Sequence, residues 1–378
     1  MTQSPAAAIT VEELERDPHP VLARLRESEP VAFVPALGGW LVTSRELALH
    51  VLRDAETFTV DDARFSTGRV VGPSMLSRDG GEHTRHREPF APSLRLAPVR
   101  ERYESLVRAE VDALIDRFAP TGRAELRSEL AGPLSVRVVT QLLGLDGAET
   151  ATVLRWYDAI VASVHGITAG RPPSGEGRTA FAELSASVGP RLGRVGDLSG
   201  AEAVSNAAVM MFGGIETTEA MIVNLVFHLL SSPAELELVR AEPRLLASAV
   251  EESLRLEPAA AVVDRFATRD VELGGARIAE RELMIVSLAG ANRDPAFFPD
   301  PDRFDVRRGN ARHHLAFAQG AHVCIGMHLA RLEATVAAGR LLDRLRGLRL
   351  DPRRRTAPQG LVFRKPPRLD VLWDGDGR

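Results

Sequence analysis

Residues 317–326 read Phe317-Ala318-Gln319-Gly320-Ala321-His322-Val323-Cys324-Ile325-Gly326 and contain the only cysteine of the 378-residue chain. A periodic segment from Met327 to Arg346 follows and predicts a helix directly after this loop. A thiolate at Cys324 is favoured there by the helix dipole, and by backbone N–H groups that Gly320 and Gly326 allow to come close. The stretch therefore predicts a soft anionic ligand held ready for a metal.

Two other interpretations of Cys324 stay open on spacing alone. A free cysteine is usually a small buried hydrophobic residue, and nothing in the loop excludes that role. A zinc site could also draw on nearby side chains, although the spacing matches no common zinc motif. Its ligands would come from His322, Cys324 and His328, with His313 or His314 as a further candidate.

A second informative segment runs from about residue 201 to residue 230 and is apolar at helical spacing. Thirty residues make a helix of about 45 Å, long enough to form the spine of the fold. In its middle stand Gly213 and Gly214, and each interior glycine costs about 1 kcal/mol relative to alanine. Gly213 and Thr217 lie on one face, and Glu216 directly precedes Thr217. The space beside Gly213, the alcohol of Thr217 and the acid of Glu216 suit a site that admits a diatomic molecule and relays protons to it. The alternative is that the glycines only allow close contact with another helix.

The rest of the chain predicts a mainly α protein with small β-sheets. No alternation of strands and helices of the βαβ type appears, which argues against a Rossmann or barrel enzyme. Strands are expected in a hairpin at 31–42, at 271–273 and 283–288, and in a C-terminal hairpin at 360–373. Helices are expected at 44–53 with Ser44 as N-cap, through 82–144 with breaks, at 150–165, 178–192, 233–255 and 327–346, and a long irregular loop at 58–81.

Composition excludes several classes of protein. The 47 basic residues are balanced by 51 acidic ones, so the chain as a whole lacks the excess of positive charge that favours binding to nucleic acid. The N-terminus has no signal pattern, and polar residues interrupt the most apolar stretch, so we expect no membrane span and a cytoplasmic protein. We expect a single domain over 1–378, with a β-rich part at about 28–60 and a helical core at about 82–350.

The pattern F-x-x-G-x-H-x-C-x-G, continued by Leu329-Ala330-Arg331, resembles the haem-binding loop of the cytochrome P450 family. This resemblance covers most of the chain. It implies the P450 fold, a triangular prism with a long central helix over the haem. It also implies haem b as cofactor, Cys324 as axial ligand and metal-binding residue, and Phe317 and Gly326 as neighbours of the cofactor.

Further motifs fit the same family. The stretch around Gly213, Gly214, Glu216 and Thr217 resembles its A/G-G-x-D/E-T-T element, with Glu216 and Thr217 as an acid–alcohol pair and all four as catalytic-site residues. Gly213 stands where alanine is common. Four residues match haem-propionate contacts, although the first two alone would suit a solvated basic face. They are His83, Arg87, Arg265 and His322.

Glu252 and Arg255 match the E-x-x-R element of the family, whose third member is expected to be Arg303. On its own this spacing would indicate a surface ion pair worth a few tenths of a kcal/mol, about 0.2–0.5. The resemblance assigns the three residues instead to folding and haem retention.

The resemblance implies a haem-thiolate monooxygenase that inserts one atom of O2 into a small, mainly hydrophobic substrate of bacterial secondary metabolism. It also implies a ferredoxin and its NAD(P)H reductase as electron donors, docking on charges such as Arg95, Arg100 and Arg340. A peroxide-driven peroxygenase and a non-catalytic haem protein are the alternatives. The substrate pocket is expected to use 64–75, 161–178, 209–212, 259–263 and 361–363, and to suit a substrate with a polar or acidic group.

The segment between Leu192 and Ala201 is shorter than in relatives. The short segment predicts that the substrate site is unusually open on its distal side. A carrier-tethered substrate would be one reason for this opening, and a deletion without functional consequence is the alternative.

Overall fold

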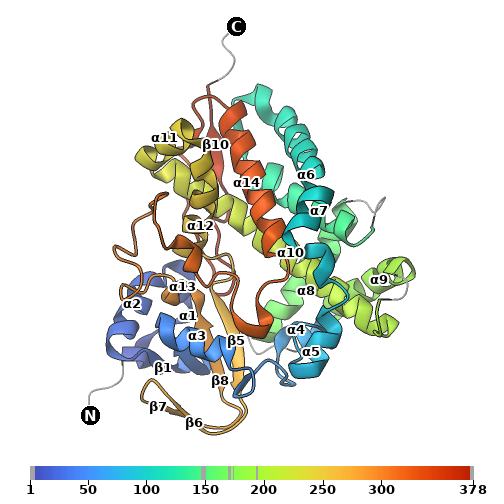
Figure 1. Cartoon of the computed structure of the whole chain (residues 1–378), viewed down its shortest axis with the longest axis vertical. Helices are drawn as coiled ribbons and strands as arrows, with labels where there is room; N and C mark the ends of the chain where they lie inside the picture. Colours follow the sequence, from blue (N-terminus) through green and yellow to red (C-terminus); the bar gives the residue numbers. More distant parts are fainter. Residues whose placement is uncertain (1–4, 146–149, 169–171, 173, 193–194, 375–378) are drawn as a thin grey trace.

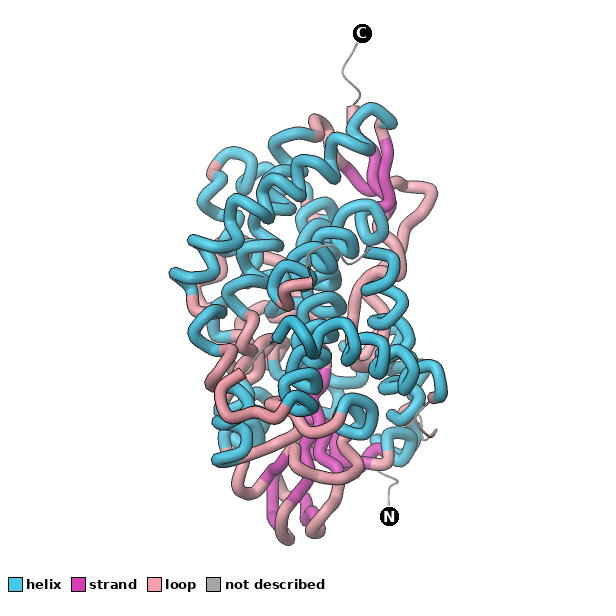
Figure 2. The backbone as a smooth tube through the Cα atoms, turned by 90° about the vertical axis from the view of Figure 1, so that its right-hand side faces the viewer, coloured by secondary structure: helices cyan, strands magenta, loops and turns pink. Residues whose placement is uncertain are grey.

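A computed structural model describes residues 5–145, 150–168, 172, 174–192 and 195–374. One long helix, α10 (Gly200–Ser231), runs through the middle of the molecule, with helices packed around it and the main sheet at the end nearest the N-terminus (Figure 1). Figure 2 shows most strands at the end nearest the N-terminus and a second, smaller group near the C-terminus, with helices filling most of the rest. The expectation of a mainly α fold with small sheets is confirmed.

The elements follow in chain order. The other α-helices are α1 (Val11–Arg16), α2 (His19–Ser28), α3 (Arg45–Arg53), α4 (Ser66–Val71), α5 (Gly80–Arg87), α6 (Leu96–Phe118), α7 (Gly132–Leu142), α8 (Thr150–Thr168), α9 (Gly175–Leu192), α11 (Pro233–Ala241), α12 (Leu246–Leu256), α13 (Leu288–Ala291) and α14 (Met327–Arg344). The strands are β1 (Val31–Val34), β2 (Gly39–Val42), β3 (Phe58–Thr59), β4 (Arg123–Glu125), β5 (Val262–Ala267), β6 (Val271–Leu273), β7 (Ala276–Ile278), β8 (Leu283–Ser287), β9 (Arg349–Leu350) and β10 (Asp370–Leu372). A turn of π-helix, η5 (Arg127–Ala131), leads into α7.

Helix α10 begins at a capping box. The backbone N–H of Glu202 donates to Ser199 Oγ, and the backbone N–H of Ser199 donates to Glu202 Oε2 at 2.8 Å. Most residues of α10 are buried all around the helix, which is the pattern of a central core helix. By length and composition α10 could cross a membrane, but 83% of its most apolar window is buried inside this fold.

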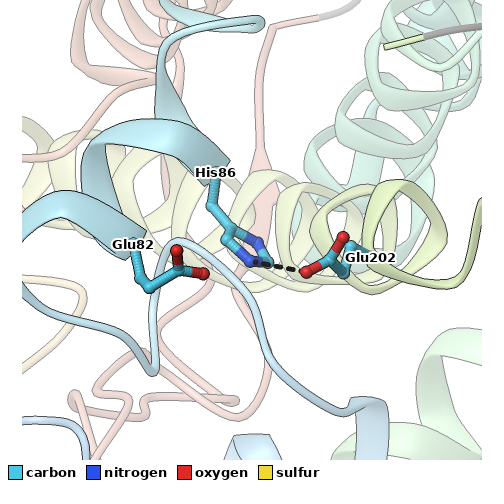
Figure 3. A group of neighbouring side chains, drawn as sticks. All are labelled: Glu82, His86 and Glu202. Carbon is cyan, nitrogen blue, oxygen red and sulfur yellow. Dashed lines mark ion pairs between the residues drawn. The ribbon is translucent and has the colours of Figure 1, made fainter. Parts of the chain in front are cut away.

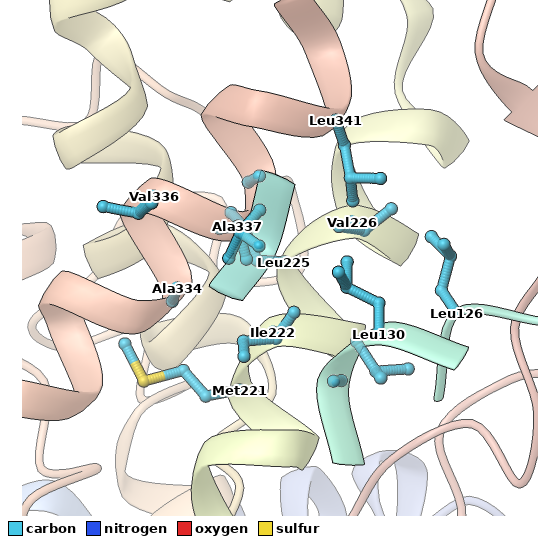
Figure 4. Close-up of a cluster of buried hydrophobic side chains, with 14 of the residues drawn as sticks. Leu126, Leu130, Met221, Ile222, Leu225, Val226, Ala334, Val336, Ala337 and Leu341 are labelled. Carbon is cyan, nitrogen blue, oxygen red and sulfur yellow. The ribbon is translucent and has the colours of Figure 1, made fainter. Parts of the chain in front are cut away.

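The largest core cluster joins α10 to α14, α6 and the η5–α7 segment. Figure 4 shows Met221, Ile222 and Leu225 of α10 between side chains of α14 and Leu130 of η5. Burial of a leucine or isoleucine is worth about 1.5–3 kcal/mol, so this cluster holds the helix that follows residue 326 firmly against α10.

The five-stranded sheet has the order β1-β2-β8-β5-β3. Strand β2 pairs with β8 in parallel, while the other neighbours are antiparallel. The expected hairpin at 31–42 is present, with Val31 opposite Val42. Strand β5 was not predicted, because its residues Val262–Ala267 include Asp264 and Arg265, which break the apolar pattern.

Three further expectations were wrong. The supposed loop at 58–81 contains β3 and α4. The helix expected over 233–255 is interrupted after Ala241, because Pro243 cannot continue it, and it resumes as α12. The C-terminal hairpin expected at 360–373 does not form: β10 pairs with β9, which lies before that segment, and with β4, which is far from it in sequence.

Helix α1, near the N-terminus, contacts a segment late in the sequence. The backbone N–H of Gly360 donates to the carbonyl of Glu15 at 2.9 Å, and the buried guanidinium of Arg364 donates to the same carbonyl at 3.0 Å. Helix α1 is therefore held against the segment 360–364.

Candidate functional site

A cavity of about 1190 Å³ opens between α10, strand β5 and the loop before α14. This volume exceeds the range of about 300–1,000 Å³ that holds one drug-sized ligand, so a large cofactor and a substrate fit together. Its wall contains nearly all segments that were expected to form a pocket, and most of these side chains are apolar. They include Met75, Val164, Ile167, Val209, Met210, Phe212, Ala259, Val262, Val263, Leu361 and Phe363.

Cys324 lies in the wall of this cavity. Its backbone N–H donates to the carbonyl of Phe317 at 2.9 Å, which closes the loop, and its side chain is accessible only where it meets the cavity. Burial raises the pKa of the Cys324 thiol, while the backbone N–H groups of Gly326 and Met327 and the guanidinium of Arg87 act to lower it. Deprotonation therefore depends on a metal, which replaces the thiol proton when it binds.

The two glycines of the loop serve different purposes. Gly320 has φ +75°, and a Cβ there would lie 2.4 Å from the carbonyl oxygen of Leu52, so only glycine fits. A Cβ at Gly326 would meet nothing within 4 Å, and Gly326 lines the cavity beside Cys324. Gly326 thus leaves room next to the thiol.

Two guanidiniums face the same cavity with most of their donors free, and Arg265 is buried while Arg87 is half-buried. Among the described residues, Arg265 donates one side-chain hydrogen bond, to the carbonyl of Asp264 at 2.7 Å, and Arg87 one, to the carbonyl of Val323 at 2.6 Å. Burial lowers the pKa of both side chains. Buried guanidiniums need anionic partners, and carboxylates match their donor geometry. A cofactor with an iron for Cys324 and carboxylates for the arginines fits this cavity.

The two histidines are placed differently. His322 lies in the wall, and its Nε2 is 2.7 Å from Asp79 Oδ1. Burial acts to raise the pKa of Asp79, but hydrogen bonds from His322, Thr59 and the backbone of Val60 lower it to about 2. His83 stands behind His322, with ring centroids 4.3 Å apart, and its nitrogens approach the carbonyls of Met75 and Ala321. His83 does not line the cavity in the described part of the chain.

The zinc interpretation of Cys324 finds no support in the described residues. The group of side chains there that could hold a metal is Glu82, His86 and Glu202, far from the cysteine in sequence (Figure 3). Arg85 already occupies that group, since its Nη2 donates to Glu82 Oε2 at 2.7 Å and to Glu202 Oε1 at 2.5 Å. The cluster ties α5, which carries His83 and Arg87, to the first turn of α10.

Comparison with known proteins agrees with this geometry. The family model described as cytochrome P450 matches residues 190–373. The chain is 36% identical to the cytochrome P450 monooxygenase PikC of Streptomyces venezuelae, across 94% of this chain and 89% of that protein. The chain belongs to the cytochrome P450 family.

Two further known proteins are similar to this P450 along nearly its whole length. It is 33% identical to 6-deoxyerythronolide B hydroxylase of Saccharopolyspora erythraea, across 97% of this chain and all of that one. A solved structure of P450BioI in complex with an acyl carrier protein ligated to hexadec-9Z-enoic acid superposes with a TM-score of 0.86 at 28% identity, covering 96% and 100% of the two chains. The protein is thus an oxidoreductase of the P450 type with haem b as cofactor.

The middle of α10 separates the acid from the alcohol. Gly213, Gly214 and Thr217 line the cavity, and Thr217 Oγ1 donates to the carbonyl of Gly213 at 2.5 Å. Glu216 is buried but is not among the lining residues; its Oε1 lies 2.7 Å from Lys365 Nζ. Successive residues of a helix point about 100° apart, so Glu216 must turn before it can reach Thr217.

The two glycines of α10 differ in their surroundings. A Cβ on Gly214 would lie 2.5 Å from Val139 Cγ2 of α7, so Gly214 allows the close contact of α10 with α7. A Cβ on Gly213 would meet nothing within 4 Å.

We expect Gly214→Ala to lower the unfolding free energy by about 1–3 kcal/mol through overpacking. Gly213→Ala is the matched variant and should raise it by up to about 1 kcal/mol, because alanine is the better helix former. The denaturation temperatures of the two purified variants check this. Equal temperatures would contradict the assignment of the contact to Gly214.

The E-x-x-R element lies in the core, where the expected surface pair is replaced by a network. Glu252 and Arg255 are fully buried and joined by two hydrogen bonds, of 2.7 and 2.8 Å. The third side chain is Arg308, whose Nε donates to Glu252 Oε1 at 2.9 Å. The expected member, Arg303, contributes its backbone carbonyl, while its side chain is 65% exposed and faces Glu235.

Sequence reasoning missed Arg308, Lys365 and Asp79. Arg308 sits beside Arg307 in a run of charges, and motif spacing alone favoured Arg303. Lys365 and Asp79 lie far in sequence from the glutamate and histidine they contact. A signal for Lys365 was present, since it is the only lysine of the chain.

Proposed function

We propose that the protein is a haem-thiolate monooxygenase that inserts one atom of O2 into a small, mainly hydrophobic substrate in bacterial secondary metabolism. The observation that carries this proposal is one cavity with Cys324, Arg87, Arg265 and Thr217 in its wall. Bound haem supplies the redox chemistry, and electron donation from a thiolate ligand favours O–O cleavage. The named activities of PikC and 6-deoxyerythronolide B hydroxylase support the general reaction class.

The chain's own residues have three tasks in this proposal. Arg87, Arg265 and His322 bind the carboxylates of the cofactor and fix its orientation. The apolar wall excludes water from the substrate. Thr217 holds a hydroxyl proton at the cavity surface, and Glu216 replaces that proton from the outer side of α10. Gly213 leaves space for a diatomic molecule beside Thr217.

Electrons come from outside in this proposal, from a ferredoxin and its NAD(P)H reductase. Arg95 and Arg100 lie at the start of α6 and remain candidates for the docking face. Arg340 is a weaker candidate, because Asp112 Oδ1 lies 2.8 Å from its Nε and neutralises it.

Substrate choice is also part of the proposal. Arg69 of α4 lines the cavity with an exposed side chain and suits a substrate that carries an acidic group. Arg64 lines it too, but Asp62 holds its guanidinium at 2.8 Å. The likeness to P450BioI, solved with an acyl carrier protein, supports a carrier-tethered substrate as a separate alternative. Part of the short segment after Leu192, residues 193–194, lies outside the described residues.

The test incubates the protein with a compound that shifts the spin state of its ferric haem. Either NADPH with ferredoxin and reductase, or hydrogen peroxide, is then added. We expect product from the NADPH system, and a loss of product per NADPH of about 100-fold in Thr217→Ala, in the range for lost acid–base catalysis. Thr217→Ser keeps the hydroxyl and should retain product formation. Product from peroxide alone, equal in the wild type and in Thr217→Ala, would favour a peroxygenase instead.

A further inference from the structure

The only lysine of the chain contacts the acid of the oxygen-activation motif. Lys365 Nζ lies 2.7 Å from Glu216 Oε1 and 2.7 Å from Glu219 Oε1, and about a tenth of each side chain is exposed. Both carboxylates belong to α10, three residues apart and hence on one face. The lysine comes from a segment nearly 150 residues further along the chain. One ammonium therefore bridges two carboxylates just outside the cavity wall.

The backbone that carries Lys365 is fixed on both sides. Its neighbour Arg364 is fully buried and donates to Glu257 Oε1 at 2.7 Å. Asn224 of α10 donates from Nδ2 to the carbonyl of Arg364 at 2.9 Å. Lys365 itself exchanges backbone hydrogen bonds with Gln359. The ammonium is therefore presented to α10 from a rigid base, so its position does not depend on the ion pairs alone.

The surrounding charges are unequal for the two carboxylates. Glu219 has a second cation, because Arg127 Nε donates to its Oε1 at 2.6 Å, whereas Lys365 is the cation that the structure places on Glu216. Asp158 of α8 also faces this group, and its pKa is raised by burial and by the charge of Glu219. If Glu216 turns away, Lys365 keeps Glu219 as partner and is not left buried without a counter-ion. Release of Glu216 therefore avoids most of the penalty of breaking a buried pair.

We propose that Lys365 is a positioning residue for proton delivery, which holds Glu216 on the outer side of α10 and passes to Glu219 when Glu216 turns toward Thr217. This inference rests on the proposed monooxygenase function. The proton moves from solvent to the Glu216 carboxylate, and from the Glu216 carboxyl group to the oxygen of Thr217 as the Thr217 hydroxyl gives up its own proton to the cavity. Each group ends the cycle in its starting protonation state.

The first experiment observes the ion pair without turnover. Protein labelled with ¹⁵N at the lysine side chain has one Nζ resonance, because Lys365 is the only lysine. We expect this resonance to shift in Glu216→Gln and again in Glu219→Gln, measured on the reduced, CO-bound holoenzyme, which is diamagnetic. A resonance that moves in Glu219→Gln but not in Glu216→Gln would overturn the proposal.

The second experiment measures coupling, the ratio of product to NADPH consumed. Lys365→Gln should lower coupling about three- to tenfold, because the Glu216 carboxylate loses the cation that holds it in place. Lys365→Arg keeps the charge and should restore most of the coupling. Arg127→Gln is the matched comparison, since it removes the cation shared with Glu219 but no ion pair to Glu216, and it should lower coupling less than Lys365→Gln does.

The outcomes separate the two hypotheses. If Lys365→Gln lowers only the denaturation temperature and leaves coupling unchanged, or if Lys365→Arg does not restore coupling, Lys365 merely anchors the C-terminal segment and the inference fails. If the wild type forms no product with NADPH, the proposed function fails, while the Nζ resonance still reports whether Lys365 binds Glu216.

Discussion

Replacement of Cys324 by serine should abolish the absorption bands of a haem-thiolate and reduce product formation to background. The hydroxyl of serine is far less acidic than a thiol, and it would lie in a place where burial already opposes an anion. The measurement is the reduced, CO-bound spectrum of the purified variant, together with its haem content.

His328→Gln is the control for this result. His328 was a candidate ligand in the zinc interpretation and lies one residue inside α14. Its replacement should leave both haem content and spectrum unchanged. Unaltered bands in Cys324→Ser, or a loss of metal in His328→Gln, would refute the assignment of Cys324 as the axial ligand.

Replacement of Glu252 by glutamine should lower the unfolding free energy by about 3–5 kcal/mol, the cost of leaving a buried partner charge unpaired. Glu252 accepts from Arg255 and Arg308 and from the backbone N–H of Asp305, so one neutral side chain leaves two adjacent guanidiniums without their anion. Arg255 also donates to the carbonyls of Asn292, Pro301 and Arg303, which hold the segment leading to the cysteine loop. We therefore expect haem loss on mild heating as well.

Arg303→Gln provides the comparison, because it changes an exposed side chain and keeps the backbone carbonyl that Arg255 uses. Its denaturation temperature should match that of the wild type, whereas the denaturation temperatures of Arg308→Gln and Glu252→Gln should both be lower. Equal stability of Glu252→Gln and Arg303→Gln would show that the buried network does not hold the fold.

The sequence was most informative where function depends on neighbouring residues. A hydrogen bond from the Cys324 N–H to the Phe317 carbonyl closes the cysteine loop, and both glycines of the loop lie within the same ten residues. The sequence motif therefore contains all of these residues. The length of α10 and its start near residue 201 followed from its apolar spacing, and the structure adds a capping box at Ser199. Local patterns were sufficient for these features because the forces that create them act over one or two turns.

Prediction failed where distant segments supply the partner. The choice between Arg303 and Arg308 depends on how the chain turns after Pro301, and the E-x-x-R spacing contains no information on that turn. Strand β10 joins β4 and β9 because of where the helices bring it, so a local hairpin pattern misled. The outward position of Glu216 depends on Lys365, nearly 150 residues further along the chain.

The contact between helix α1 and the segment 360–364 has a consequence for biosynthesis. The cavity wall includes Val11 and Glu15 of α1 as well as Gly360 and Phe363, and the backbone of Gly360 is bonded to that of Glu15. A nascent polypeptide therefore cannot enclose its prosthetic group until residues 360–363 have emerged from the ribosome. Contacts of such large sequence separation form late and slowly during folding. Before they form, the open apolar pocket exposes the polypeptide to aggregation.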